Sequence, residues 1–232
     1  MLRRVPVWVW WAIPLAPLAI LMLPRLALML IGGGYYSIPS SSMLPTLPVG
    51  SAFLAMPVRT GTLPQRGDVV VFSHPRNPEV DYVKRIVGLP GDRIAVRNGV
   101  VWLNGVELRQ RTRPEYTAEL DINGFGGQDS CELSEDRRSK TCTFAQREEV
   151  LPSGRRYAVL DMGHSRADEF TEVTVPDSHV FGLGDHRDNA VDSRFPSVGM
   201  IPVKNLKHRA WRFWVNFAKP GAHWGRFGQE VR

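Results

Sequence analysis

The sequence predicts a mainly β protein, with an antiparallel β-sheet domain behind one N-terminal transmembrane helix and with a polar insertion. Short apolar or alternating runs separated by turn residues recur along the chain, and no later segment carries a sustained helical period. An uncharged run near the N-terminus supplies the helix. With 232 residues, of which 43% are hydrophobic and 22% charged, the chain can bury a sizeable core. This favours one principal domain and excludes a fully disordered chain.

The N-terminal run covers residues 5–24, which are 20 residues without a charge and match the thickness of a bilayer core. Arg3 and Arg4 precede it. The positive-inside rule therefore predicts a cytoplasmic tip at residues 1–4, a transmembrane anchor at residues 5–31, and everything later on the outer side. A cleaved secretory signal is the alternative. Its apolar region usually has only about 7–15 residues, so a retained anchor is favoured.

Seven short runs have the pattern of strands, at residues 68–72, 81–87, 93–96, 100–103, 157–160, 172–175 and 180–183. Turn residues separate them, for example at 75–78. Asn98-Gly99 between two apolar runs is a strong signal for a hairpin. These runs predict a β domain in two parts, residues 32–108 and 156–217, which follows a flexible joint at Gly32-Gly33-Gly34.

Residues 109–155 are polar and Gly-rich and lack a strong apolar pattern, so we interpret them as an insertion or cap on the β core. Cys131 and Cys142 lie in this segment. On the outer side of the membrane they could form a disulfide, worth roughly 2–3 kcal/mol through loop entropy. Two free thiols are the alternative. No other ligand spacing surrounds them, so a metal site is not expected.

The net charge of +6 and the isoelectric point of about 9.7 fit a membrane surface better than nucleic acid. Lys and Arg are scattered among acidic residues, and the sequence has no zinc spacing, helix-turn-helix or RNA-binding signature. Residues 218–232 and the segment before them are basic and aromatic. This composition fits a membrane interface, or else a core strand followed by a disordered tail.

Ser42 lies in a serine-rich, proline-flanked segment, 11 positions after residue 31. Even fully extended, that tether reaches only ~36–40 Å, so a site built there stays close to the bilayer. A serine nucleophile needs a base to accept its proton. Among the six histidines the best candidate is His186, which falls among charged residues, although no histidine lies in a run that marks a base.

Lys84 is the other candidate base. It lies in the run at 81–87, where strand alternation places Tyr82, Lys84 and Ile86 on one face. A free lysine has a pKa of about 10.4 and is protonated at neutral pH. Burial among apolar groups disfavours the ammonium and can lower that pKa by several units. A lysine that snorkels from a half-buried strand is the alternative.

Four motifs follow one another along the chain: Ser40-x-Ser42-Met43-x-Pro45-Thr46-Leu47, Arg66-Gly67-Asp68-Val69-Val70-Val71-Phe72, Tyr82-Val83-Lys84-Arg85-Ile86-Val87-Gly88-Leu89-Pro90-Gly91-Asp92, and Gly184-Asp185-x-Arg187-Asp188-Asn189-x-x-Asp192-Ser193-Arg194. They resemble, in the same order, the conserved boxes of bacterial type I signal peptidases, the serine–lysine leader peptidases. The resemblance covers most of the chain from Tyr36 to residue 217 and is weak between 109 and 155.

The resemblance implies a membrane-anchored serine endopeptidase that removes signal peptides from exported preproteins, with Ser42 as nucleophile and Lys84 as general base. The Ser42 backbone N–H and the Ser40 hydroxyl would form the oxyanion hole. Shallow pockets for small substrate side chains would be lined by Ile38, Pro39, Tyr82 and Val83. Ion pairs that brace the site would join Asp185 with Arg85 and Asp192 with Arg194.

The resemblance further implies that the protein uses no cofactor or metal and acts as a monomer. Its partners would be signal peptides and the lipid bilayer, with no nucleic acid. It would span the bacterial inner membrane once, with the catalytic domain on the periplasmic side.

Three positions depart from the family pattern. Ala190 stands where a serine hydroxyl commonly helps to orient the base lysine, so the orientation of Lys84 needs another explanation. His186 replaces a common asparagine, and Ser41 replaces a common glycine.

Other functions stay open at this point. A specialised peptidase of a conjugation or secretion system would use the same motifs. A catalytically silent membrane-anchored scaffold would account for Ala190 but not for the presence of both Ser42 and Lys84. A Ser–His hydrolase would use His186, and its activity would survive Lys84→Ala.

Overall fold

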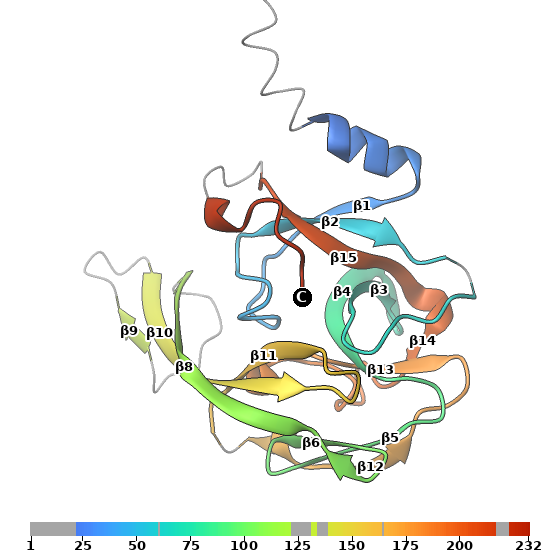
Figure 1. Cartoon of the computed structure of the whole chain (residues 1–232), viewed down its shortest axis with the longest axis vertical. Coiled ribbons are helices and arrows are strands. Elements are labelled where there is room, and N and C mark those ends of the chain that lie inside the picture. The colour runs from blue at the N-terminus through green and yellow to red at the C-terminus, as the bar shows by residue number, and fades with distance from the viewer. Residues whose placement is uncertain (1–21, 60, 122–130, 134–138, 164, 217–222) are drawn as a thin grey trace, which may run out of the picture.

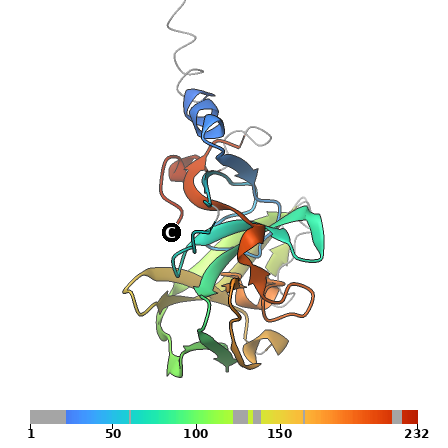
Figure 2. The same cartoon turned by 90° about the vertical axis from the view of Figure 1, so that its right-hand side faces the viewer.

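The computed structural model describes residues 22–59, 61–121, 131–133, 139–163, 165–216 and 223–232. Most of the predicted anchor therefore lies outside the described residues, and only its last part, residues 22–30, is seen as a helix. Figures 1 and 2 show this helix at one end of the molecule, beside β1 (Gly34–Ser37). Within the described ranges, no helix has both the length and the apolar character that a membrane crossing needs.

The predicted antiparallel β fold is confirmed, because all of the strand pairs among the described residues are antiparallel and form three sheets (Figure 1). The largest sheet has seven strands, in the order β1, β2 (Ala52–Pro57), β15 (Leu206–Trp214), β3 (Val69–His74), β4 (Asn77–Gly88), β13 (His179–Leu183) and β14 (Ile201–Pro202). The turn predicted at 75–78 is shorter than expected, since β4 already begins at Asn77. Strand β4 is buried on both faces toward its C-terminal end, where Lys84 lies.

A second sheet holds β12 (Phe170–Thr174), β5 (Arg93–Arg97), β6 (Val100–Leu103) and β7 (Val106–Glu107). The hairpin predicted at Asn98-Gly99 joins β5 to β6. Both turn residues have positive φ, 49° and 74°, which is the conformation that favours Asn and Gly there. Single-turn 3₁₀ helices lie between other strands, namely η2 (Arg166–Asp168), η3 (Arg187–Asn189) and η4 (Val203–Asn205), and η5 (Trp224–Arg226) follows β15.

The segment 109–155 differs from expectation, because it contains the longest strands of the protein. The third sheet consists of β11 (Arg156–Asp161), β10 (Ser139–Val150) and β8 (Arg109–Asp121), with β9 (Cys131–Leu133) also paired to β10. Strand β8 is exposed along most of its length, so it needs no apolar alternation and has no pattern that predicts a strand. Phe144 of β10 is nevertheless buried in a cluster with Leu44 and Leu160. The ribbon of β8 and β10 is therefore part of the core.

Cys142 is disulfide-bonded. The only other cysteine of the chain is Cys131, whose backbone lies directly opposite Cys142 in the register of β9 and β10. This agrees with the pairing that the sequence favoured.

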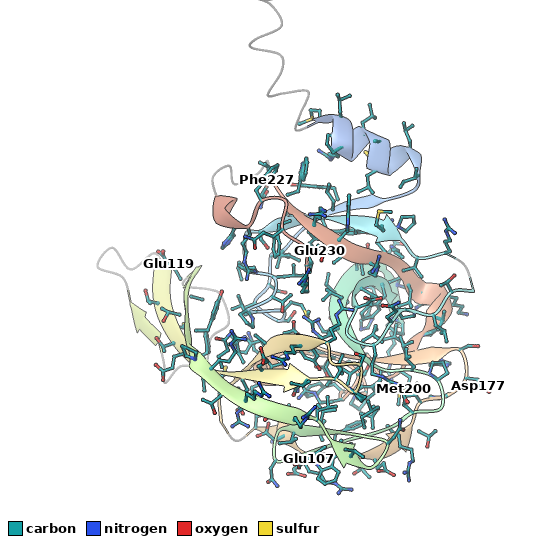
Figure 3. All side chains as sticks on the ribbon, viewed as in Figure 1. Glu107, Glu119, Asp177, Met200, Phe227 and Glu230 are labelled. Atoms are coloured by element: carbon teal, nitrogen blue, oxygen red, sulfur yellow. The ribbon has the colours of Figure 1, made fainter. Side chains whose placement is uncertain are left out.

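Two further segments are more tightly packed than the sequence suggested. Gly33 of the predicted flexible joint approaches the Leu28 side chain so closely that a Cβ atom there would lie 2.3 Å from Leu28 Cγ. Residues 223–232 fold back onto β15 (Figure 3, where Phe227 and Glu230 are labelled). Val231 is buried, and its N–H donates to the Trp211 carbonyl at 3.0 Å. The described part of the tail is therefore docked, and β15 is a central strand.

Replacing Phe144 by Ala tests whether the ribbon contributes to the core. Phe144 is 2% exposed, so we expect the variant to lose about 3–5 kcal/mol of unfolding free energy through lost burial and a cavity. Urea unfolding of both proteins measures this. Thr117→Ala, at an exposed position of the same ribbon, is the control and should change stability by less than about 0.5 kcal/mol. A Phe144 variant as stable as its control would mean that the ribbon is only loosely attached.

Candidate active site

Ser42 lies in the loop between β1 and β2, and this loop is held by its own apolar side chains. Met43, Leu44 and Leu47 are buried, and the Leu47 N–H donates to the Met43 carbonyl at 2.8 Å. The proline-flanked sequence is thus a compact turn whose apolar residues face the core. Ser42 itself is only partly buried, so its hydroxyl is fixed by the loop and still accessible.

Lys84 is brought to Ser42 by the seven-stranded sheet, where it pairs with Val70 across β3 and β4. Its side chain is 3% exposed. Nζ lies 3.3 Å from Ser42 Oγ and 2.9 Å from the Val83 carbonyl oxygen. Gly182 of β13 lets the neighbouring strand come close, because a Cβ there would be 3.1 Å from Lys84 Cβ. The predicted face of β4 is therefore buried, and it points the amine at the serine.

The electrostatic environment favours the neutral amine. Burial lowers the pKa of Lys84 from 10.5 to about 8, although Asp192 and Asp185 oppose this shift and Arg194 assists it. A neutral amine can donate one hydrogen to the Val83 carbonyl and accept the proton of the Ser42 hydroxyl with its lone pair. The pair has the geometry that a nucleophile and its base require, and the lowered pKa of Lys84 leaves a fraction of the amine neutral near physiological pH.

Ser40 lies beside Ser42, with 3.4 Å between the two hydroxyl oxygens. Ser40 is exposed. Among the described residues, the Ser42 backbone N–H has no hydrogen-bond acceptor, so both predicted oxyanion donors are available to a substrate.

The four predicted substrate-binding residues occupy two neighbouring segments. Ile38 is buried in the cluster that Val83 also contacts, Pro39 is exposed, and Tyr82 is half-buried. Strand β13 pairs with β4 only from Arg85 onward, whereas β3 takes the opposite edge. The edge of β4 next to Tyr82 and Val83 therefore has no strand partner within the part of the chain that the structure describes.

The two predicted ion pairs are present and buried. Arg85 donates to Asp185 at 2.7 and 2.6 Å, and Arg194 donates to Asp192 at 2.9 and 2.8 Å. Thr46, which sequence reasoning did not single out, donates its hydroxyl to Asp185 at 2.5 Å. The loop of Ser42 is thus tied to the same ion pair that flanks Lys84.

His186 is placed near Ser42 but not as its base. Its ring nitrogens lie 3.3 Å from the Ser41 carbonyl oxygen and 3.0 Å from Met162 Sδ. Burial lowers the pKa of His186 to about 4, so the ring is neutral at physiological pH. Its backbone N–H donates to the Ser42 carbonyl at 3.2 Å. His186 therefore supports the backbone of the Ser42 loop. A Ser–His mechanism would need the ring to contact the Ser42 hydroxyl, but its nitrogens contact Ser41 and Met162 instead.

Ala190 packs against Gly184, where a Cβ would lie only 2.1 Å from Ala190 Cβ. Position 190 has no hydroxyl to orient Lys84, but the Val83 carbonyl accepts a hydrogen bond from Lys84 Nζ and can orient the amine instead. Within the described ranges, no group of three or more His, Cys, Asp or Glu side chains could hold a metal ion.

Sequence reasoning missed one element of the site. Arg187, within the fourth motif, pairs with Glu149 of strand β10, in the segment where the resemblance is weak. A single glutamate in a polar strand carries no sequence signal of this kind.

The chain matches the family described as "Signal peptidase, peptidase S26" over residues 8–214. It is 30% identical over 221 residues to a signal peptidase I of Buchnera aphidicola subsp. Schizaphis graminum, covering 82% of this chain and 70% of the relative. It is 32% identical over 207 residues to a signal peptidase I of Pseudomonas fluorescens, covering 80% of this chain and 66% of the relative. The chain thus spans about two thirds of the length of these relatives.

Among solved structures, a signal peptidase I from Enterococcus faecalis V583 is 22% identical, with a TM-score of 0.34. The match covers 64% of this chain and 97% of that chain. A likeness at this level adds nothing to what the strands of this chain show.

Replacing Lys84 by Met should stabilise the protein. Because the folded state lowers the pKa of Lys84 to about 8, keeping the ammonium buried at pH 7 costs about 3 kcal/mol, and Met removes most of this cost. Between pH 8 and 10.5 the folded state is deprotonated before the unfolded state, so wild-type stability rises and the advantage of Met shrinks. Urea unfolding at pH 7 and pH 10 measures both effects, with exposed Lys204→Met as the control. Equal stability of wild type and Lys84→Met at both pH values would contradict the lowered pKa of Lys84.

Proposed function

The chain belongs to the S26 family of signal peptidases, and from this premise we propose that it cleaves signal peptides from exported preproteins with Ser42 and Lys84 as its catalytic pair. The observation that carries the proposal is the 3.3 Å contact between Ser42 Oγ and the buried Lys84 Nζ. Burial lowers the pKa of the amine to about 8, so that a neutral fraction can accept a proton near physiological pH, and the rigid loop keeps the hydroxyl within reach.

In the first step, Ser42 Oγ attacks the carbonyl carbon of the scissile peptide while its proton passes to Lys84 Nζ. The oxygen of the tetrahedral intermediate accepts hydrogen bonds from the Ser42 N–H and the Ser40 hydroxyl. The Lys84 ammonium then protonates the leaving amine as the C–N bond breaks, which leaves an acyl-enzyme on Ser42. Lys84, neutral again, takes a proton from the attacking water, and hydrolysis returns the free serine.

The substrate would bind as an extended segment next to the unpaired edge of β4, beside Tyr82 and Val83. Ile38 and Pro39 would close the other side of the shallow pockets. Small side chains before the scissile bond suit such pockets, which fits the small-x-small pattern of cleavable signal peptides.

We further propose that residues 5–31 anchor the protein once in the bacterial inner membrane, with the β domain on the periplasmic side. The described end of this segment supports the proposal, because Leu23, Leu26 and Leu30 of the helix expose 56–80% of their surface. Apolar side chains in that position are better solvated by lipid than by water. The preproteins and the bilayer are then the partners of a monomeric enzyme.

A silent scaffold has one observation in its favour, the alanine at position 190. The Val83 carbonyl already accepts from Lys84 Nζ, so the missing hydroxyl does not leave the amine without an orienting partner. Catalysis is therefore the better supported function.

Cleavage of a purified preprotein, with the enzyme in detergent or lipid, tests the proposed pair. Wild type should cut after a small-x-small sequence, and both Ser42→Ala and Lys84→Met should lower kcat by at least about 10³-fold, because each removes a group that the others cannot replace. Lys204→Met should cleave like the wild type. Cleavage that survived either active-site substitution would refute the pair. A wild type that cleaves only a specialised precursor would indicate a dedicated processing enzyme, and an inert one would favour the scaffold.

The pH profile tests the state of Lys84. Only the neutral amine acts as base, so kcat/KM should fall about tenfold per pH unit below pH 8 and level off above it. Initial rates between pH 6 and 9.5 on a short preprotein-derived peptide measure the profile. A rate that stays flat down to pH 6 would mean that another group accepts the serine proton.

A further inference from the structure

A buried group of charges joins the ribbon to the loop that follows β13. Glu149 of β10 is fully buried, and its carboxylate accepts from Arg187 of η3 at 2.7 and 2.5 Å. The Tyr157 hydroxyl donates to the same carboxylate at 2.8 Å, and Gln110 Nε2 donates at 3.0 Å. All of these partners are donors, so Glu149 is held as an anion.

The protonation state agrees with this geometry. Burial by itself would raise the pKa of Glu149, but the Arg187 guanidinium outweighs burial and holds that pKa below its usual range. The adjacent Glu148 lies on the other face of the strand, where its side chain is 14% exposed and pairs with Arg113. Glu149 is thus a fully buried charge, whereas Glu148, the other acid of β10, keeps part of its side chain in solvent.

Arg187 connects Glu149 to the backbone of Gly184. Its Nε donates to the Gly184 carbonyl at 3.2 Å, while the Gly184 N–H donates to Asp192 at 2.9 Å. Arg194, the partner of Asp192, donates to the Arg187 carbonyl at 2.5 Å. The ring of contacts fixes both backbone groups of Gly184.

The loop fixed in this way is in direct contact with Ser42. A Cβ at Gly184 would lie 2.7 Å from the Ser42 carbonyl oxygen, so the two backbones touch. Two residues further on, the His186 N–H donates to the same oxygen at 3.2 Å. Any displacement of residues 184–190 therefore moves Ser42 relative to Lys84.

A second route leads to the strand of Lys84. The Tyr157 ring, whose hydroxyl binds Glu149, lies 4.3 Å under the Arg85 guanidinium. The three buried guanidiniums around the site are matched by three buried carboxylates, in the pairs Arg85–Asp185, Arg187–Glu149 and Arg194–Asp192. Without Glu149, the positive charge of Arg187 would lack its buried carboxylate beside the loop of residues 184–190.

We propose that Glu149 is a positioning residue for the peptidase reaction, which acts through Arg187 to hold the loop of residues 184–190 against Ser42. The inference rests on the proposed function. It assigns a role at the active site to a residue of the ribbon, outside the four motifs.

The test compares Glu149→Gln with its neighbour Glu148→Gln, which removes the same charge from the opposite, partly exposed face of the same strand. Because a misplaced Ser42 slows the chemical step without altering the substrate-binding residues, Glu149→Gln should lower kcat by about 10- to 100-fold with KM unchanged. Glu148→Gln should match the wild type in both parameters. Tyr157→Phe removes one hydrogen bond but keeps the Arg187 pair, so kcat should fall less than in Glu149→Gln.

Loss of one buried charge can also prevent folding, so a second variant separates the two effects. Glu149→Met combined with Arg187→Leu removes both charges, and such replacements are far better tolerated than single ones. If this double variant unfolds in urea like the wild type but keeps a low kcat, the positioning role holds. Wild-type kcat in either the folded double variant or Glu149→Gln would overturn it. A wild type that cleaves no preprotein would instead refute the proposed function.

Discussion

The site depends on burying one amine beside a hydroxyl, so that the pKa of the amine falls far enough for its neutral form to act as a base. Lys84 is covered by β3 on one side and by Gly182 of β13 on the other, and this burial is what lowers its pKa. Two buried carboxylates close by act in the opposite direction. Without counter-charges they would hold the ammonium in place and abolish its use as a base. The guanidiniums of Arg85 and Arg194 are therefore a condition for the chemistry as well as for folding.

The nucleophile sits on a loop, where positional precision is hard to achieve, and the structure supplies it from several directions. Buried leucines anchor the loop from below, Thr46 binds Asp185, and the His186 N–H holds the Ser42 carbonyl. Each contact comes from a different element. A neutral His186 is suited to this position, because burial of the ring against Met162 and Phe144 outweighs the opposing effect of Asp188 on its pKa.

Much of this could be predicted from local sequence, and what failed has a physical reason. Period-2 runs and the Asn98-Gly99 turn predicted strands of the first two sheets because those signals are local. The approach of Ser42 to Lys84, 42 positions apart, followed from motif resemblance and not from any pattern in the chain. Strand β8 escaped prediction because most of its described side chains are exposed, and β10 because a register shift after Phe144 interrupts the alternation of its buried residues. The docked tail escaped because Val231 is a single apolar residue among polar ones.

The ribbon shows why a polar, weakly patterned segment can still be constrained at one position. The fourth motif places the Arg187 guanidinium where solvent cannot reach it, and a buried guanidinium without an acid is strongly unfavourable. The motif's own carboxylates have other partners, because Asp185 and Asp192 pair with other arginines and Asp188 accepts from the Met162 N–H and the Ser165 hydroxyl. The acid must therefore come from a strand that packs over Arg187, which is β10. On this argument most positions of the ribbon can vary in sequence. Position 149 cannot, because it supplies the acid that pairs with Arg187.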